Sequence, residues 1–176
     1  NSVFAGEYGW FSFEQIQWYR EQSKAYTATN GGNPLPAFSF FHIPLPEYAN
    51  IKTYERTVGN RSEGVYAGAL NSGMFSSMYE MGDVMGTFVG HDHNNDYVGV
   101  YGGIALAYGK ATGVDTYGEN VKGGRVIVMY EGKRYFDTWL RDEHGNKTDM
   151  FYYPSGASDD EIAKYKDSTL PAIILI

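Results

Sequence analysis

Three of the four histidines in the 176-residue chain follow short apolar runs of the kind that form buried strands. His42 comes after one such run, and His91 and His93 follow another. In an extended segment, residues two apart point to the same side, so His91 and His93 can face one cavity while Asp92 points elsewhere. Neutral imidazole binds Zn, Fe, Mn or Ni, and carboxylate or amide oxygens would complete the coordination shell. The spacing therefore predicts a metal site at the strand ends.

The residues around the His-x-His pair admit two interpretations. Gly90 has no Cβ, so it lets the backbone turn sharply and approach the cavity closely. Four polar residues lie between or after the two histidines: Asp92, Asn94, Asn95 and Asp96. They could accept ring N–H groups and so orient the imidazoles, or they could simply form a turn. Each histidine could likewise be an ordinary polar loop residue, which is the interpretation we adopt for the fourth, His144.

The segments that must position these histidines are short apolar runs bounded by turn residues. We expect strands over 37–41 and 85–89, each ending next to a histidine. Residues 13–28 are predicted to form a helix that begins with a capping box of Ser12 and Gln15. Its apolar face is expected to comprise Phe13, Ile16, Tyr19 and Tyr26.

Further along the chain the pattern alternates between one more helix, a long loop and hairpins. Leucine and methionine recur at helical spacing over 70–81, whereas 50–68 is polar and irregular and is expected to be mostly loop. Residues 97–108 suggest a strand or hairpin, and 125–130 should pair with 134–141 across a turn. The apolar tail, 170–176, is not expected to lie free in water.

The composition indicates a globular chain and excludes several kinds of partner. With 43% hydrophobic and 20% charged residues, the chain does not resemble a disordered protein, and its length fits a single domain, 1–176. A net charge of −7 argues against binding to a nucleic-acid backbone or to an anionic membrane. The lack of cysteine excludes thiolate ligands and a cysteine nucleophile. Uncharged stretches are too short for a membrane span, so we expect a soluble chain.

Two motifs in this chain resemble a known family. Gly90-His91-Asp92-His93 is similar to the terminal G-H-x-H motif of the calcineurin-like metallophosphoesterases, and 40–48 resembles their preceding strand-His motif. The strings at 82–97 and 124–134 are similar to the subgroup related to purple acid phosphatases. The likeness covers about 12–141. The family's earlier motifs, D-x-H, G-D-x-x-D and G-N-H, are missing from the sequence, so the chain resembles only the C-terminal half of such a domain.

The resemblance implies both a fold and a chemistry. The fold is α/β, namely the C-terminal half of a four-layer α/β/β/α sandwich that has a mixed sheet with flanking helices. The chemistry is phosphatase or phosphodiesterase action on a phosphate ester, in which a hydroxide that bridges two metal ions attacks phosphorus. In the full enzyme these would be divalent or trivalent ions of Fe, Zn or Mn. His42 and His91 would bind one ion and His93 the other, and Asp92 is not expected to be a ligand.

Because the bridging carboxylate and the other ligands are missing, we expect this chain alone to bind metal weakly or not at all and to be nearly inert. One alternative is a non-catalytic module on the same scaffold, which binds one structural ion or none. Another is that the missing N-terminal half of the domain is a second chain that completes the site. Half a sandwich would leave an apolar sheet face uncovered, so we expect a homodimer or a repacked tail. Location stays open: an upstream signal peptide would make the protein extracytoplasmic.

Overall fold

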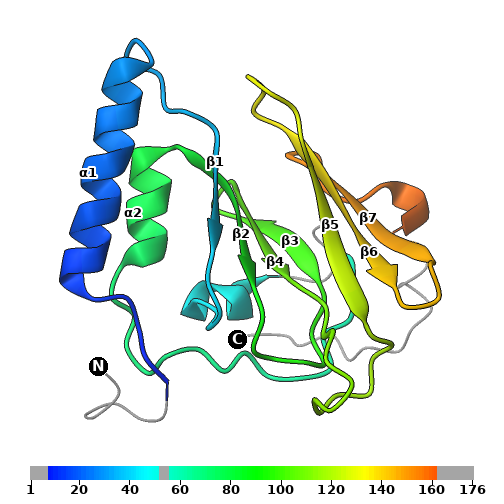
Figure 1. The fold of residues 1–176 in the computed structure, drawn as a ribbon. Helices are drawn as coiled ribbons and strands as arrows, with labels where there is room; N and C mark the ends of the chain where they lie inside the picture. Colours follow the sequence, from blue (N-terminus) through cyan, green and yellow to red (C-terminus); the bar gives the residue numbers. More distant parts are fainter. Residues whose placement is uncertain (1–7, 52–55, 162–176) are drawn as a thin grey trace.

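The computed structural model describes residues 8–51 and 56–161, and its first element is a helix that lies beside the second helix at one side of the fold (Figure 1). Helix α1 spans Phe13–Thr29 and begins with the predicted capping box of Ser12 and Gln15. Only Ile16 and Ser23 are buried on it. The predicted apolar face is wrong at both ends, since Phe13 is 75% exposed and Tyr26 59% exposed. The helix packs mainly on one other helix, so one stripe suffices to bury it.

A mixed four-stranded sheet holds the segments that end in histidines. Its strands are β1 (Ala37–Phe40), β2 (Val84–Val89), β3 (Val98–Tyr101) and β4 (Ile104–Tyr108), in the order β1-β2-β4-β3. The pairs β1–β2 and β2–β4 are parallel, and β3 is antiparallel to β4. Every residue of β2 is buried, as expected for a central strand in parallel pairing. The structure therefore confirms the strands predicted at 37–41 and 85–89, and of the strand or hairpin predicted over 97–108 it has the hairpin.

Two helical segments complete the layer on one face of this sheet. Helix α2 spans Met74–Met81 and ends at Gly82, which adopts the left-handed conformation. It is shorter than the predicted 70–81, because Gly73 is also left-handed (φ 85°) and Leu70 lies outside the helix, 51% exposed. The short 3-10 helix η2 spans Pro46–Asn50. No helix in the described part of the chain is long and apolar enough to cross a membrane.

A second, antiparallel sheet covers the other face. It consists of β5 (Gly123–Met129), β6 (Phe136–Asp142) and β7 (Lys147–Tyr153), in that order. The β5–β6 hairpin was predicted. Strand β7 was not, because it begins with polar residues and its pairing with β6 contains a register irregularity, so it lacks regular alternation. Figure 1 shows this sheet on the opposite side of β1–β4 from the helices.

The apolar core is divided between the two faces of the four-stranded sheet. On the helical side, Leu106 and Tyr108 of β4 cluster with Met78 of α2. On the other side, Ala105 and Ala107 of β4 belong to a cluster that also contains Phe88, Phe136 and Phe151. The structure is thus an α/β fold with a mixed sheet and flanking helices.

The two core clusters change the physical reason for expecting a homodimer. The uncovered sheet face from which we inferred a dimer is covered in the described residues by β5–β7. The apolar tail at 170–176 lies outside the described residues. Strand β1 lies at an edge of the four-stranded sheet, and Phe40 on it is 65% exposed. A homodimer therefore stays a prediction, with a different physical basis.

Candidate functional site

The three histidines predicted as ligands line one pocket of about 190 Å³ at the ends of β1 and β2. The rings of His42 and His91 lie edge to face, with centroids 5.2 Å apart. The backbone N–H of Gly90 donates to the carbonyl of His42 at 3.2 Å, which ties the two strand ends together. Parallel strands place their carboxyl ends at the same edge of a sheet. The pairing of β1 with β2 is therefore what brings His42 and His91, 49 residues apart in the chain, into contact.

His91 begins a turn, so the geometry differs from the extended His-x-His segment that the spacing suggested. Its φ is 76°, in the left-handed region, so the sharp bend falls on His91 and not on Gly90. A Cβ on Gly90 would lie 3.4 Å from Nδ1 of His42, an ordinary contact. The ring of Tyr8 meets His91 edge-on at 4.4 Å. Burial lowers the pKa of the His91 imidazole, and nearby His42 adds to this, which favours the neutral form that binds metals.

His93 is held by Tyr117. Their rings stack with centroids 4.0 Å apart, and Nδ1 of His93 lies 2.9 Å from the carbonyl oxygen of Tyr117. A carbonyl can only accept, so Nδ1 carries the hydrogen and Nε2 keeps the lone pair. The hydroxyl of Tyr117 donates to Glu63 at 2.9 Å and accepts from the backbone N–H of His93. This arrangement leaves Nε2 of His93 as its only ligating atom.

Asp92 is turned into the protein between the two histidines and is 2% exposed. Its Oδ2 accepts hydrogen bonds from the hydroxyl of Tyr108 and from the backbone N–H of Tyr66. Its Oδ1 is buried without a hydrogen-bond partner in the described part of the chain. Burial raises the pKa of the Asp92 carboxyl, against the lowering effect of those two hydrogen bonds. The Asp92 carboxyl therefore ties the turn to the Tyr108 side chain and to the backbone of Tyr66.

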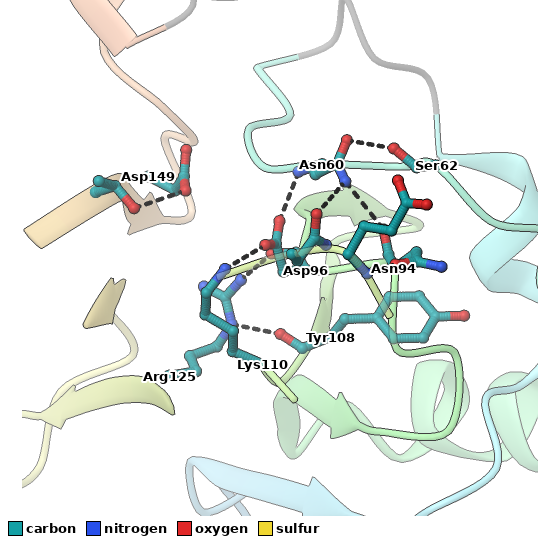
Figure 2. Close-up of polar contacts among 11 residues, drawn as sticks. Asn60, Ser62, Asn94, Asp96, Tyr108, Lys110, Arg125 and Asp149 are labelled. Atoms are coloured by element: carbon teal, nitrogen blue, oxygen red, sulfur yellow. Dashed lines mark hydrogen bonds and ion pairs between the residues drawn. The ribbon is translucent and has the colours of Figure 1, made fainter. Parts of the chain in front are cut away.

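The other three polar residues of the turn bind the segment at 60–64. Asn94 accepts from the amide of Asn60 through its backbone carbonyl, and Asn95 accepts the backbone N–H of Glu63. Asp96 accepts the backbone N–H of Asn60 at 2.6 Å (Figure 2). These contacts correspond to the turn-forming alternative. A role in orienting the imidazoles stays a prediction.

Two cations hold the end of the turn against the sheets. Lys110 and Asp96 form an ion pair of 2.7 Å whose side chains are 10% and 6% exposed. Arg125, from β5, donates to the backbone carbonyls of Tyr108 and Asp96 (Figure 2). The second sheet thereby braces the loop that carries His91 and His93.

The donor set fits a metal site only in part. No group of three or more His, Asp or Glu side chains in the described residues is arranged to hold a metal ion. Two carboxylates line pockets together with the histidines, and both are bound to other groups: Asp92 to Tyr108, and Glu63 to Tyr117 and the backbone N–H of Asn94. Imidazoles without a carboxylate can hold a single ion. The described residues therefore do not build a two-metal centre.

Sequence reasoning missed several residues that lie around the histidines. Tyr117 and Glu63 come from irregular loops and Lys110 follows β4. None belongs to a motif or has a regular spacing from the histidines, so no local signal pointed to them. They reach the site only through the folding of the loops. His144 lies in the exposed turn between β6 and β7 and lines none of the pockets described here.

Comparison with known proteins gives three relatives from Arabidopsis thaliana, each named "Probable inactive purple acid phosphatase" with a number. Number 29 is 35% identical over 140 residues, which is 75% of this chain and 36% of that protein. Number 28 is 33% identical over 155 residues, 81% of this chain and 38% of its own length. Number 14 is 34% identical over 132 residues, 72% of this chain and 33% of its own length.

The chain thus spans about a third of the length of the curated relatives that it matches. No family model matches the chain, and no solved structure matches it. The similarity extends over most of this chain, so it is not confined to the histidine motifs.

Proposed function

This chain belongs with the purple-acid-phosphatase-like proteins of the calcineurin-like metallophosphoesterases, and on that premise we propose that it carries the histidine side of a metal site for phosphate esters. The ligands would be His42, His91 and His93. In the whole protein, a pair of ions such as Fe, Zn or Mn would supply an activated hydroxide and neutralise the charge of the phosphate. The chain by itself would have little or no hydrolytic activity.

The observation that carries this proposal is the shared pocket of the three histidines. His42 and His91 are in contact, and the hydrogen bond of His93 to Tyr117 leaves Nε2 free to bind an ion. A ring N–H fixed by a carbonyl in this way is common among metal-binding histidines. The three imidazoles would therefore bind a cation, and the cation would bind the phosphate. The imidazoles themselves would not act as catalytic groups.

The low activity follows from the carboxylates. A two-metal site needs a carboxylate that bridges the ions, and the two carboxyl groups beside the histidines accept hydrogen bonds from other groups: Asp92 from Tyr108, and Glu63 from Tyr117. The printed names of the relatives, which call them inactive, agree with this expectation. The missing ligands would come from an N-terminal half of the domain, on this chain's parent protein or on a second chain.

A second candidate function is a non-catalytic module that binds one structural ion or none. The observation in its favour is that the described residues contain no ready three-ligand group. The two candidates differ in whether the histidines belong to a two-part site, so metal binding and turnover with and without an added N-terminal half separate them.

The test measures Zn²⁺ binding by calorimetry and the hydrolysis of 4-nitrophenyl phosphate, both with the purified chain. We expect one weak site, lost in His42→Ala and His91→Ala and kept in His144→Ala, and turnover no faster than a metal-only blank. An absence of binding would favour the non-catalytic module. Clear turnover that depends on His91 would contradict the proposed lack of activity. Tighter binding on addition of the N-terminal half of a relative would support the two-part site.

A further inference from the structure

A second pocket, of about 240 Å³, shares His42 with the pocket of the three histidines. Three separate segments build it: 9–15 before and at the start of α1, 41–46 after β1, and 68–72 before α2. We call it the apolar pocket after its main side chains: Trp10, Phe11, Phe41, Ile43, Leu45 and Leu70. It is thus the neighbour of the candidate metal site on the side of His42.

The walls of the apolar pocket are held firmly. Phe11 and Phe41 meet edge to face with ring centroids 5.2 Å apart. Pro44 and Pro46, which also line it, have no N–H, so this wall offers few polar backbone groups. Gly68 lies so close to the segment at 9–10 that a Cβ would come within 2.6 Å of the carbonyl oxygen of Gly9. The pocket is therefore formed by packed backbone as well as by side chains.

The lining of the apolar pocket also contains polar residues. One is Gln15, whose Oε1 accepts the backbone N–H of Ser12. Asn71 and Ser72 lie on the opposite segment, and Asn71 is anchored by a hydrogen bond to Glu47. Ligand pockets commonly combine an apolar lining with a few polar groups at fixed positions. The apolar pocket has this arrangement.

We propose that the apolar pocket takes the organic group of a phosphate ester, namely an aryl or similarly flat apolar alcohol. The inference rests on the proposed function for the place of the phosphate, at His42 and His91. His42 lies in both pockets, so a single ester would reach both. The volume suits one or two fused rings and is smaller than the pockets that hold drug-sized ligands. An ester of a sugar or of another polar alcohol would place its hydroxyl groups against these apolar walls, which costs free energy because the hydroxyl groups lose hydrogen bonds to water.

The first test uses 1-naphthol, which has no phosphate and needs no metal. It is titrated into the ¹⁵N-labelled wild-type chain while the amide signals are followed by NMR. We expect saturable shifts at Phe11, Ile43 and Leu70, with a Kd in the millimolar range that is typical of so small a ligand. If 1-naphthol leaves these signals unchanged, or shifts only distant ones, the inference is wrong.

Variants then test whether binding depends on the apolar walls. Leu70 is 51% exposed and lies outside any helix, so Leu70→Ser should fold normally and weaken 1-naphthol binding about tenfold. Leu35→Ser is the matched control, because Leu35 is 39% exposed and lines none of the described pockets. Equal loss of affinity in both variants, or none in Leu70→Ser, would overturn the inference.

The last arm separates this inference from the proposed function. 1-Naphthyl phosphate is compared with 1-naphthol in the presence of Zn²⁺, in the wild type and in His91→Ala. We expect the phosphate to strengthen binding in the wild type and not in His91→Ala, while 1-naphthol binds both alike. If Zn²⁺ does not bind but 1-naphthol does, the metal site fails and the apolar pocket stands. If Zn²⁺ binds but 1-naphthol does not, the apolar pocket fails alone.

Discussion

At the scale of single residues, the ion pair of Lys110 and Asp96 is the most deeply buried charge interaction near the site. Asp96 also accepts the backbone N–H of Asn60, and Arg125 binds the carbonyl of Asp96, so the carboxylate lies at a junction of three segments. A buried charge that loses its partner is costly, whereas exposed pairs contribute little. The stability of the loop at 90–96 should therefore depend on Lys110.

We predict that Lys110→Ala lowers the free energy of unfolding by about 3 kcal/mol, because it leaves the Asp96 carboxylate buried with only part of its hydrogen bonds. Urea unfolding followed by circular dichroism measures this. Lys133→Ala, in the exposed turn between β5 and β6, is the control and should change stability by less than about 0.5 kcal/mol. Similar stability of the two variants would show that the pair contributes little.

Tyr117 is a positioning residue, since its ring and hydroxyl contact His93 and Glu63 while no atom of it is expected to touch the ion. We predict that Tyr117→Phe weakens Zn²⁺ affinity about tenfold, because the hydroxyl no longer ties the loop to Glu63. Competition with a chromogenic chelator measures the affinity. Thermal unfolding should be nearly unchanged, and Tyr79→Phe, 63% exposed on α2, should leave both quantities unchanged. An unaltered Zn²⁺ affinity in Tyr117→Phe would show that the Tyr117 hydroxyl does not position the site.

At the scale of elements, the sequence predicted segments well where a pattern is local. The capping box located the start of α1, and apolar runs between prolines and glycines located β1 and β2. Burial on α1 was predicted only in part: Ile16 is buried, whereas the described chain leaves Phe13 and Tyr26 mostly exposed. Which face of a helix is covered depends on tertiary contacts that periodicity does not specify.

The candidate site, too, could be predicted from the sequence only in part. His42 and His91 could be brought together from the sequence, since each follows a strand and parallel pairing aligns the strand ends. The hydrogen bond between His93 and Tyr117 could not, because the loop at 109–122 has no periodic pattern that would fix its path. The hydrogen bond from Tyr108 to Asp92 could not be predicted either, because it depends on where the end of β4 lies relative to the turn.

The β5–β6 hairpin gives a prediction at this scale. A Cβ on Gly123 would collide with the carbonyl oxygen of Arg141 on the paired strand, whereas a Cβ on Gly124 would meet nothing within 4 Å. Gly123→Ala should lower the free energy of unfolding by about 1 to 3 kcal/mol through the displaced strand. Gly124→Ala is the matched control and should be neutral or slightly stabilising. Chemical denaturation compares the two variants, and a Gly123→Ala chain as stable as Gly124→Ala would contradict the expected clash.

At the scale of the whole molecule, strand β1 forms one edge of the four-stranded sheet and is a surface suited to association. Strand β1 pairs only with β2, so one side of it has unpaired backbone groups in the described structure. Phe40, on this strand, stacks on Phe88 and is 65% exposed. An exposed edge with an apolar side chain favours pairing with another chain.

We predict that the chain forms a homodimer at high concentration and that Phe40→Lys shifts it to the monomer, because a lysine on an edge strand opposes strand pairing. Sedimentation velocity over a range of concentrations measures this. Val114→Lys, at a position that is 86% exposed in a loop, adds the same charge away from β1 and should not change the equilibrium. A wild-type chain that stays monomeric throughout would contradict the prediction.

The candidate site brings together His42 at the end of one strand and His91 and His93 in the turn after another, and in this chain alone the three imidazoles are proposed to bind one cation. The most direct measurement follows the ring nitrogens of all four histidines by ¹⁵N NMR while Zn²⁺ is added to the wild-type chain. We predict that the signals of His42, His91 and His93 change together and that His93 changes at Nε2, while His144 stays as it was. Changes confined to His144, or spread equally over all four rings, would contradict the account.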